Sequence, residues 1–314
     1  MIAEFKDEID ESGPPPHIEN WLIERDKTWQ CAGVLLDEFI GRFQTGSFSK
    51  PYKLDQFIGL EIGPGMITTV GAPPSTGKTA SSMQLVFEIL AHNPGVLAYI
   101  ANAESSFDAL MMRELSRRSG VGTRRMRRES LSVEEKDRVN NAYFRLRTDI
   151  ERVRWLGKQF STESLLDLRT QGAGFLVVDY LQKCAPPSGD PKASIQLLLN
   201  DLRLLSQDGW AVLVLSATNR ASGANANKQQ SFRDSSEIEY QSDSAYVLSV
   251  EEGQENAIDQ NVTFSCVKNR WDSKEDLQMV YRKFEQRFER RNNFGSDFSD
   301  FGSGSSDSSG GAWE

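Results

Sequence analysis

Cysteine and histidine are both scarce in this sequence, and their scarcity excludes several kinds of site. The chain has three cysteines and two histidines in 314 residues. Cys31, Cys184 and Cys266 have neither metal-type spacing nor an even number for pairing, which predicts a reducing compartment without a disulfide framework. With His17 and His92 as the only histidines, a histidine-based metal site or catalytic triad is not expected.

Long apolar runs and a basic charge excess are also missing. There is no run of about eighteen apolar residues, and we expect no signal peptide, which predicts a soluble, cytoplasmic protein without a membrane partner. The formal net charge is −9, and the acidic excess is concentrated in residues 1–50 and 285–314. The middle of the chain is almost neutral, so charge alone gives no argument for nucleic-acid binding.

The most informative stretch is a strand-like run followed by a glycine- and proline-rich turn, residues 66–79. The turn ends in Gly77-Lys78-Thr79, and a helix-like apolar pattern follows it. Strand, loop and helix in this order are the context of a P-loop, which a chance Gly-Lys-Thr would lack. Backbone N–H groups of residues 75–79 would line an anion-binding nest. Lys78 would bind the β- and γ-phosphates, and the Thr79 hydroxyl would bind Mg²⁺.

One position departs from the usual P-loop consensus. Ala72 stands where the first glycine of the motif is expected, and Gly71 lies one residue too early. The motif is therefore Ala-x-x-x-x-Gly-Lys-Thr, a variant of the usual form.

A second buried strand predicts the carboxylate that completes a nucleotide site. The run Phe175–Val178 is fully apolar and ends in Asp179, as a Walker B strand does. An Asp can follow any strand by chance, but the P-loop upstream favours a carboxylate that orients water ligands of Mg²⁺. We expect ATP and Mg²⁺ as cofactors, with Thr79 and Asp179 at the metal. The expected nucleotide contacts are Ala72, Pro73, Pro74, Ser75, Thr76, Gly77, Lys78, Thr79 and Asp179.

The remaining patterns predict an α/β domain with extensions. Strands are expected at 96–100, 153–156, 210–215, 245–250, 262–267 and 279–284, and helices in 106–154, 161–171 and 192–208, with a loop at 185–191. The predicted segments are a disordered acidic and proline-rich leader (1–20), a linker helix (21–50), the ATPase domain (51–290) and a disordered Gly/Ser/Asp/Phe tail (291–314).

Three segments allow two interpretations each. The linker helix packs either on its own domain or on a neighbouring subunit. The arginine-rich helices of 106–154 form either a solvated face with salt bridges, such as Glu134 and Glu135 to Arg138, or a surface for phosphates or subunits. The acidic tail is either inert or the binding site for a replication partner.

Four separate stretches together resemble the C-terminal motor domain of DnaB-type replicative helicases over about residues 50–285. Residues 72–79 match the family's Ala-x-Pro-Ser-x-Gly-Lys-Thr loop, and residues 179–182 are identical to its Asp-Tyr-Leu-Gln. Glu104 stands at the position of the family's catalytic base. Lys268 and Arg270 match a Lys-x-Arg that reaches the neighbouring nucleotide site. Residues 232–243 echo a further motif.

The resemblance implies a RecA-like P-loop NTPase, with a mostly parallel twisted sheet flanked by helices and antiparallel strands at the C-terminal edge. It implies an ATP-dependent DNA helicase or single-stranded DNA translocase that works as a homo-oligomer, with a hexamer expected. The implied catalytic residues are Glu104, Lys78, Lys268 and Arg270, and the candidate DNA-binding cations are Arg220, Lys228 and Arg233. Loops 185–191 and 221–232 would face the DNA.

The sequence departs from the family in two places. Ala217 replaces a glutamine that senses the γ-phosphate, which leaves the coupling of hydrolysis to DNA open. About fifty residues precede the motor, so we expect the family's primase-recruiting helical domain to be absent. Two alternatives therefore stay open: a RecA- or KaiC-like ATPase without unwinding activity, and a nucleotide-dependent adaptor or loader.

Overall fold

The computed structural model describes residues 32–45, 50–128, 130–156, 162–185, 190–218 and 240–291. The chain divides into two compact units, Met1–Ser49 and Lys50–Glu314. The leader, the first part of the linker helix, most of the two loops expected to face DNA, and the C-terminal tail lie outside the described residues. Within the described ranges, no helix is both long enough and apolar enough to span a membrane.

The first unit contributes one described helix, α2 (Ala32–Thr45). The rings of Phe39 and Phe43 stack with their centroids 6.4 Å apart, as expected for residues four positions apart on one helix face. α2 lies within the predicted linker helix of residues 21–50. Its docking on a neighbouring subunit stays a prediction.

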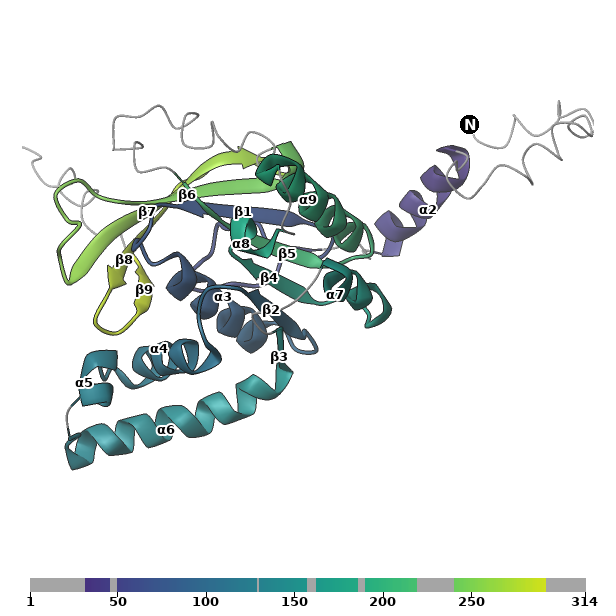
Figure 1. Ribbon diagram of the computed structural model, residues 1–314. Coiled ribbons are helices and arrows are strands. Elements are labelled where there is room, and N and C mark those ends of the chain that lie inside the picture. The colour runs from purple at the N-terminus through teal and green to yellow at the C-terminus, as the bar shows by residue number, and fades with distance from the viewer. Residues whose placement is uncertain are drawn as a thin grey trace, which may run out of the picture. The chain divides into compact units, whose positions relative to one another are not determined.

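The second unit is built on one sheet of nine strands (Figure 1). These are β1 (Ile67–Ala72), β2 (Ala98–Asn102), β3 (Val153–Leu156), β4 (Phe175–Asp179), β5 (Ala211–Ala217), β6 (Ser244–Val250), β7 (Asp259–Asn269), β8 (Leu277–Arg282) and β9 (Arg287–Arg290). Their order is β3-β2-β4-β5-β1-β6-β7-β8-β9. The first six in that order pair in parallel, and β7, β8 and β9 continue antiparallel. This confirms the predicted fold class.

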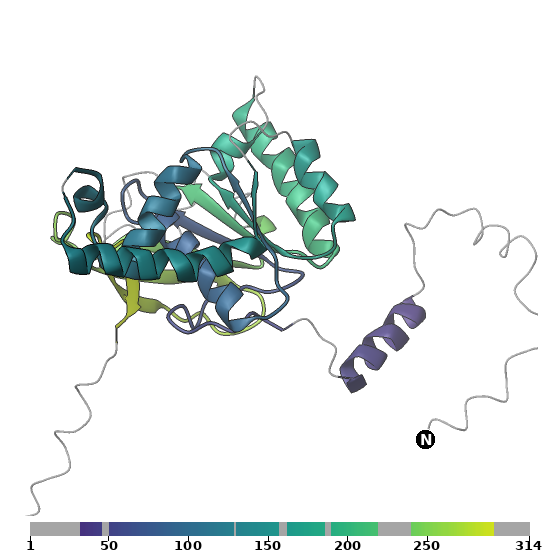
Figure 2. The ribbon, with the colours of Figure 1, turned by 90° about the horizontal axis from the view of Figure 1, so that it is seen from below.

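Helices cover both faces of the parallel strands (Figure 2). On one face lie α3 (Lys78–His92), α4 (Phe107–Ser119) and α6 (Val133–Asp149), and on the other lie α7 (Thr162–Leu166), α8 (Leu181–Cys184) and α9 (Pro191–Gln207). Helix α5 (Thr123–Arg128) contacts α4, and short 3-10 turns span Ile150–Arg152 and Asp167–Thr170. The layers therefore bury the sheet on both sides.

The central strand β5 shows why these segments are continuous apolar runs. Leu213 and Leu215 join the core that includes α3, whereas Val212 and Val214 join the core that includes α9. Alternate side chains of a strand point to opposite faces, so a strand that is covered on both faces is apolar at every position.

Parallel pairing brings the ends of several strands to one edge of the sheet. Asn102 at the end of β2 is in register with Asp179 at the end of β4, and Ala72 of β1 is in register with Ala217 of β5. The carboxyl ends of parallel strands are the usual place for a ligand site in an α/β fold.

The hairpin of β8 and β9 packs against α3. Tyr281 of β8 stacks on Phe288 of β9 with ring centroids 4.3 Å apart. The side chain of Gln84 in α3 donates to the carbonyl of Phe288 (2.7 Å) and accepts from its N–H (2.8 Å). These contacts hold the hairpin beside the first turns of α3.

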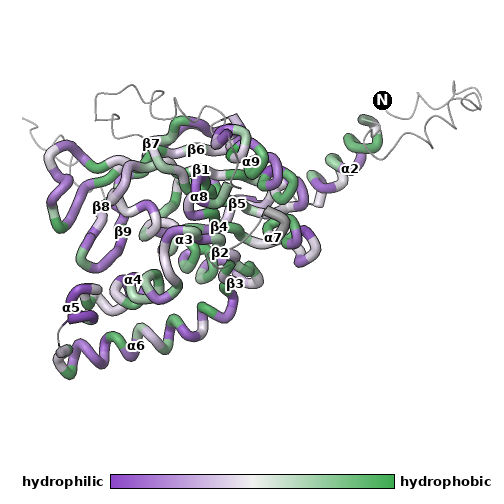
Figure 3. Tube along the Cα trace, viewed as in Figure 1, coloured by the Kyte–Doolittle hydropathy of each residue, from purple (hydrophilic) through white to green (hydrophobic). Residues whose placement is uncertain are grey.

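The arginine-rich helices α4, α5 and α6 carry many internal salt bridges. Arg117 and Arg118 both bind the buried carboxylate of Glu114. Glu135 binds Arg125, with one contact of 2.9 Å, instead of the expected Arg138, because α5 folds back beside the start of α6. Figure 3 shows α5 and much of α6 as hydrophilic. These pairs within the chain favour the salt-bridged interpretation over a surface for phosphates or subunits, although the pairs at Glu114 are buried rather than solvated.

The sequence patterns missed two elements, α8 and β9. α8 is a single helical turn, and β9 has three charged residues among its four, so neither shows an apolar period. The predicted loop at 185–191 was one residue too long, because Pro191 is the first residue of α9 and Asp190 caps it. Pro at this position is favourable since its missing N–H would have no helical partner.

Candidate nucleotide-binding site

The turn between β1 and α3 depends on Gly77. This residue has φ 94°, in the left-handed region that favours glycine. A Cβ atom at this position would lie 2.8 Å from Cζ of Phe288 and 2.9 Å from Cε1 of Tyr281. The hairpin that packs on α3 therefore leaves room for glycine alone at the end of the loop.

The loop before Gly77 is shaped for an anion. Pro73 and Pro74 have no backbone N–H, so the available donors are those of residues 75–79. Ser75 has φ 69°, and the Thr76 hydroxyl donates to the carbonyl of Pro73 at 2.8 Å. N–H groups that converge at a helix N-terminus form a site for a phosphate group.

Lys78 and Thr79 at the start of α3 face the acid at the end of β4. The Thr79 hydroxyl donates to Oδ2 of Asp179 at 2.9 Å. Burial lowers the pKa of Lys78, and the carboxylates of Asp179 and Glu104 oppose that change. Burial also raises the pKa of Asp179, against the hydrogen bond from Thr79 and the charge of Lys78. The site thus holds a desolvated cation and a desolvated carboxylate side by side.

Asn102 links the two predicted acids, and the sequence patterns did not identify this role. Its Nδ2 donates to Oδ2 of Asp179 at 2.8 Å. Its Oδ1 accepts the N–H groups of Glu104 (3.0 Å) and Ser105 (2.7 Å). One buried amide therefore fixes both the carboxylate of Asp179 and the backbone that carries Glu104.

The donor set fits a magnesium ion. Asp179 is 1% exposed, and among the described residues its Oδ1 has no hydrogen-bond partner. A buried carboxylate oxygen without a donor is costly unless a cation or its water ligands occupy that position. Mg²⁺ binds few protein carboxylates and keeps several waters and phosphate oxygens. Thr79 and Asp179 are the residues that would hold it.

A cleft of about 390 Å³ lies over these groups. Lys78, Thr79 and Glu104 line it, and so do three residues that the sequence patterns did not identify: Arg113 of α4, Tyr281 of β8, and Gln286 between β8 and β9. Burial raises the pKa of Asp179 and raises the pKa of Tyr281 to about 12. The nearby charge of Arg113 acts in the opposite direction on both groups. The predicted contacts Ala72, Pro73, Pro74, Ser75 and Gly77 also line the cleft.

Ala217, at the departure from the family pattern, also lines the cleft. Gln182 of α8 holds this end of β5 in place. Its Nε2 donates to the Ser216 hydroxyl (2.9 Å) and to the Ala217 carbonyl (3.4 Å), and its Oε1 accepts the Ala217 N–H (3.3 Å). The side chain at position 217 extends no further than Cβ.

The predicted cations Lys268 and Arg270 lie away from this cleft. Lys268 and Asn269 end β7, which runs antiparallel to β6, so Arg270 lies beside the first residues of β1. β1 spans about 16 Å between Ile67 and Ala72 at roughly 3.3 Å per residue. Arg270 is therefore on the opposite edge of the sheet from its own P-loop. Arg220, Lys228 and Arg233 lie outside the described residues.

The parallel sheet, the P-loop after β1 and the acid at the end of β4 define a RecA-like P-loop fold. Residues 48–290 match the family of the DnaB-like helicase C terminal domain, and the chain belongs to this family. Two solved structures share the fold. One, described as an ATPase domain, has a TM-score of 0.62 at 16% identity, covering 72% of this chain and 84% of its own. The other, titled "The Structure Of A DnaB-Like Replicative Helicase And Its Interactions With Primase", has a TM-score of 0.67 at 14% identity, covering 87% of this chain and 70% of its own. A comparison with curated proteins found no match.

Proposed function

We propose that this chain is the ATP-driven motor of a DNA helicase or single-stranded DNA translocase that works as a homo-oligomer, with a hexamer expected. The observation that supports this most is the cleft lined by Lys78, Thr79 and Glu104, beside the buried Asp179, whose Oδ1 has no hydrogen-bond partner among the described residues. Those groups are the ones that phosphoryl transfer requires, since its catalysis consists of positioning and charge stabilisation.

Each residue of the cleft has a proposed task. The N–H groups of residues 75–79 bind the phosphates, and Lys78 neutralises part of their charge. Glu104 orients the attacking water and accepts its proton. Asp179 and Thr79 hold Mg²⁺, which supplies charge neutralisation on the transferred group.

Lys268 and Arg270 are proposed to act on the neighbouring subunit. Their position at the far edge of the sheet keeps them from the phosphates of their own chain, because β1 separates the two places. A head-to-tail contact between subunits would bring them to the next cleft. Hydrolysis would then depend on assembly, as it does where an arginine is supplied in trans.

The test combines ATP hydrolysis with strand displacement. We expect single-stranded DNA to stimulate phosphate release, a forked duplex to be opened, and DNA binding to weaken steeply with salt. Hydrolysis that ignores DNA, together with an intact fork, would contradict the helicase proposal.

A second candidate rests on Ala217. Because its side chain lines the cleft but carries no polar group, a RecA- or KaiC-like ATPase without unwinding, or a nucleotide-dependent adaptor, is the alternative. For this candidate, hydrolysis or nucleotide-dependent assembly persists while strand displacement is absent. The proposed role of residues 291–314 in binding a replication partner would then be tested by removing them.

A further inference from the structure

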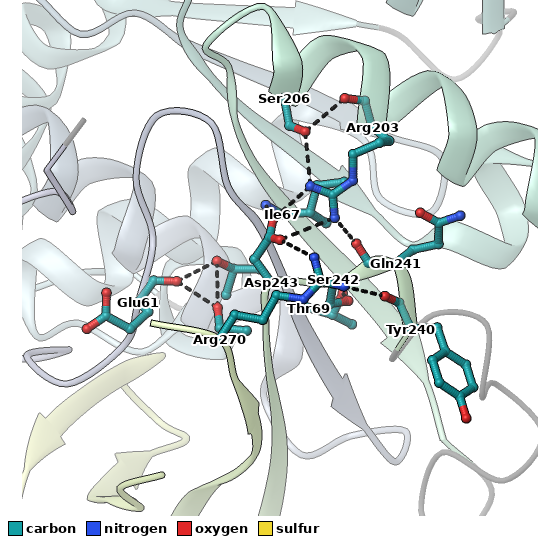
Figure 4. A network of polar contacts seen from close by, with 12 residues as sticks. Glu61, Ile67, Thr69, Arg203, Ser206, Tyr240, Gln241, Ser242, Asp243 and Arg270 are labelled. Carbon is teal, nitrogen blue, oxygen red and sulfur yellow. Dashed lines mark hydrogen bonds and ion pairs between the residues drawn. The ribbon is translucent and has the colours of Figure 1, made fainter. Parts of the chain in front are cut away.

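The carboxylate of Asp243 lies at the centre of a buried polar network just before β6 (Figure 4). Its Oδ2 accepts the N–H of Ile67 at 2.8 Å and Nη1 of Arg203 at 2.9 Å. Its Oδ1 accepts Nη1 of Arg270 at 2.9 Å. The residue is 4% exposed, so this single buried carboxylate binds two guanidinium groups and a backbone donor at once.

The two guanidinium groups are held unequally. Arg203 extends from α9, and its side chain is 23% exposed. Arg270 follows β7, and its side chain is 49% exposed. Each has a second acceptor: Arg203 binds the carbonyl of Gln241, and Nη2 of Arg270 binds the carbonyl of Tyr240 at 3.1 Å. Arg270 is therefore the more accessible of the two.

The shared carboxylate changes the energetics of releasing Arg270. Removing the only partner of a buried charge is strongly unfavourable, because the charge is left uncompensated. Asp243 would still have Arg203 and the N–H of Ile67 after Arg270 had left. Arg203 thus lets Arg270 exchange Asp243 for another anion at low cost.

The network is also anchored to the strand that leads into the P-loop. The carbonyl of Ile67 accepts the N–H of Asp243 at 2.8 Å, and the N–H of Ile67 donates to the Asp243 carboxylate. The backbone N–H of Arg270 donates to the carbonyl of Asp243 at 3.0 Å. The first residue of β1 and the backbone of Arg270 are therefore tied to the same residue.

We propose that Asp243 is a positioning residue that aims Arg270 at the neighbouring nucleotide, and that Arg203 keeps Asp243 paired when Arg270 binds the phosphate. This proposal rests on the proposed trans role of Arg270. It assigns a function to a carboxylate that touches no part of the cleft.

The test compares Asp243→Asn with Ser244→Ala in the full chain. Asparagine keeps an acceptor for Ile67 but removes the charge that holds Arg270. We expect kcat for ATP hydrolysis to fall about 10–100-fold, as for the loss of partners that orient a functional group. KM and the affinity for a fluorescent ATP analogue stay within about twofold, because the P-loop is untouched.

Ser244→Ala is the matched control. Ser244 is adjacent and fully buried, and its hydroxyl donates to the carbonyl of Glu61 (2.8 Å) and lies 3.0 Å from the Thr68 hydroxyl. Its loss should lower Tm without lowering kcat. A kcat that falls equally in both variants would show that Asp243 has only a structural role.

Two further variants separate the possible failures. Arg270→Ala alone should abolish hydrolysis, and adding Asp243→Asn to it should cause no further loss, since Asp243 acts through Arg270. Wild-type hydrolysis by Arg270→Ala would refute the proposed trans arginine. An inactive Arg270→Ala beside a fully active Asp243→Asn would overturn only the positioning role.

Arg203→Gln covers the case in which Asp243→Asn fails to fold. It leaves Arg270 as the main cation on Asp243, so release of Arg270 costs more and kcat should fall at unchanged nucleotide affinity. A folded Arg203→Gln with wild-type kcat would contradict the exchange of Arg270 between Asp243 and the phosphate.

Discussion

Strand β1 joins two polar clusters of different construction. At its carboxyl end, which we call the phosphate end, Lys78 and Thr79 meet Glu104 and Asp179, and one buried oxygen of Asp179 has no partner among the described residues. At its amino end, the arginine end, Arg203 and Arg270 share the single carboxylate of Asp243.

The difference between the two ends favours the proposal that the cation completing the phosphate end comes from the arginine end of another copy. The phosphate end has an unsatisfied acceptor and, in the proposed function, also holds a polyanion, whereas among the described residues two guanidinium groups at the arginine end share one carboxylate. A chain with these two imbalances on opposite edges of a sheet is suited to head-to-tail contact between copies, each completing the next. The following predictions test this comparison.

Lys78→Ala should have the largest effect, because it removes the main cation from the phosphate end. We expect kcat to fall on the order of 10²–10³-fold and nucleotide affinity to fall as well. Phosphate release and titration with a fluorescent ATP analogue measure both. Lys183→Ala is the control. Nζ of Lys78 and Nζ of Lys183 both lie over the Tyr180 ring, at 4.7 Å and 5.5 Å from its centroid, but Lys183 does not line the cleft. Undiminished phosphate release by Lys78→Ala would show that hydrolysis does not take place in this cleft.

Mixing two inactive variants tests whether the two ends work together across subunits. Glu104→Gln damages the phosphate end, and Arg270→Ala damages the arginine end, while ATP binding persists in each. In an equal mixture, about one interface in four combines two intact ends, so activity should return to about a quarter of wild type. Two Arg270→Ala preparations mixed together serve as the control. If the mixed oligomer recovered no ATP hydrolysis, the two ends would have to act within one subunit.

Gly77→Ala tests how closely the phosphate end is packed. The new Cβ meets two aromatic rings, and the backbone has a positive φ, so we expect about 2–4 kcal/mol of destabilisation. Gly95→Ala is the matched control, because Gly95 also has positive φ (86°) but nothing within 4 Å of its Cβ position. It should cost only about 1–2 kcal/mol. Chemical denaturation measures both values, and equal losses would contradict the packing argument.

Asp179→Asn should have the smallest effect on stability, and it should stabilise the folded chain. Burial raises the pKa of Asp179, so the folded chain binds that proton more tightly than the unfolded chain. This contribution favours the folded state at low pH and is lost as pH rises through the folded pKa. The variant should therefore raise Tm by about 2–4 °C at pH 8, and by less as the pH falls toward the ordinary pKa of an Asp side chain. A Tm difference between variant and wild type that shrinks with rising pH would contradict the raised pKa of Asp179.

The patterns that predicted β4 and β5 succeeded because strands covered on both faces are almost entirely apolar, whereas β1 was predicted as the strand-like run before the P-loop turn. The same reasoning could not find Asn102, because its role depends on a contact with Asp179, which is distant in the sequence. Gln182 was visible only as part of a matched motif, and its hold on β5 needed the structure.

Arg270 illustrates a second limit. The resemblance to the family's Lys-x-Arg motif implied a role in trans, but nothing local predicts the pairing of Arg270 with Asp243, which also binds Arg203. That pairing arises because antiparallel β7 returns to the start of β1, a consequence of strand order. Strand β9 was missed for a simpler reason, because four residues with three charges carry little apolar signal.

The grip of Gln84 on the last strand has a consequence for solubility. β9 ends the sheet, and an open strand edge is a template on which another chain can add a strand. Gln84 occupies both backbone groups of Phe288, and the side chain of Gln56 accepts the N–H of Arg290 at 3.0 Å. Among the described residues no strand pairs with this edge of β9, and the two glutamines replace part of such a partner. Helix α3, which carries Lys78 in its first turn, therefore also blocks part of the β9 edge against pairing with another chain.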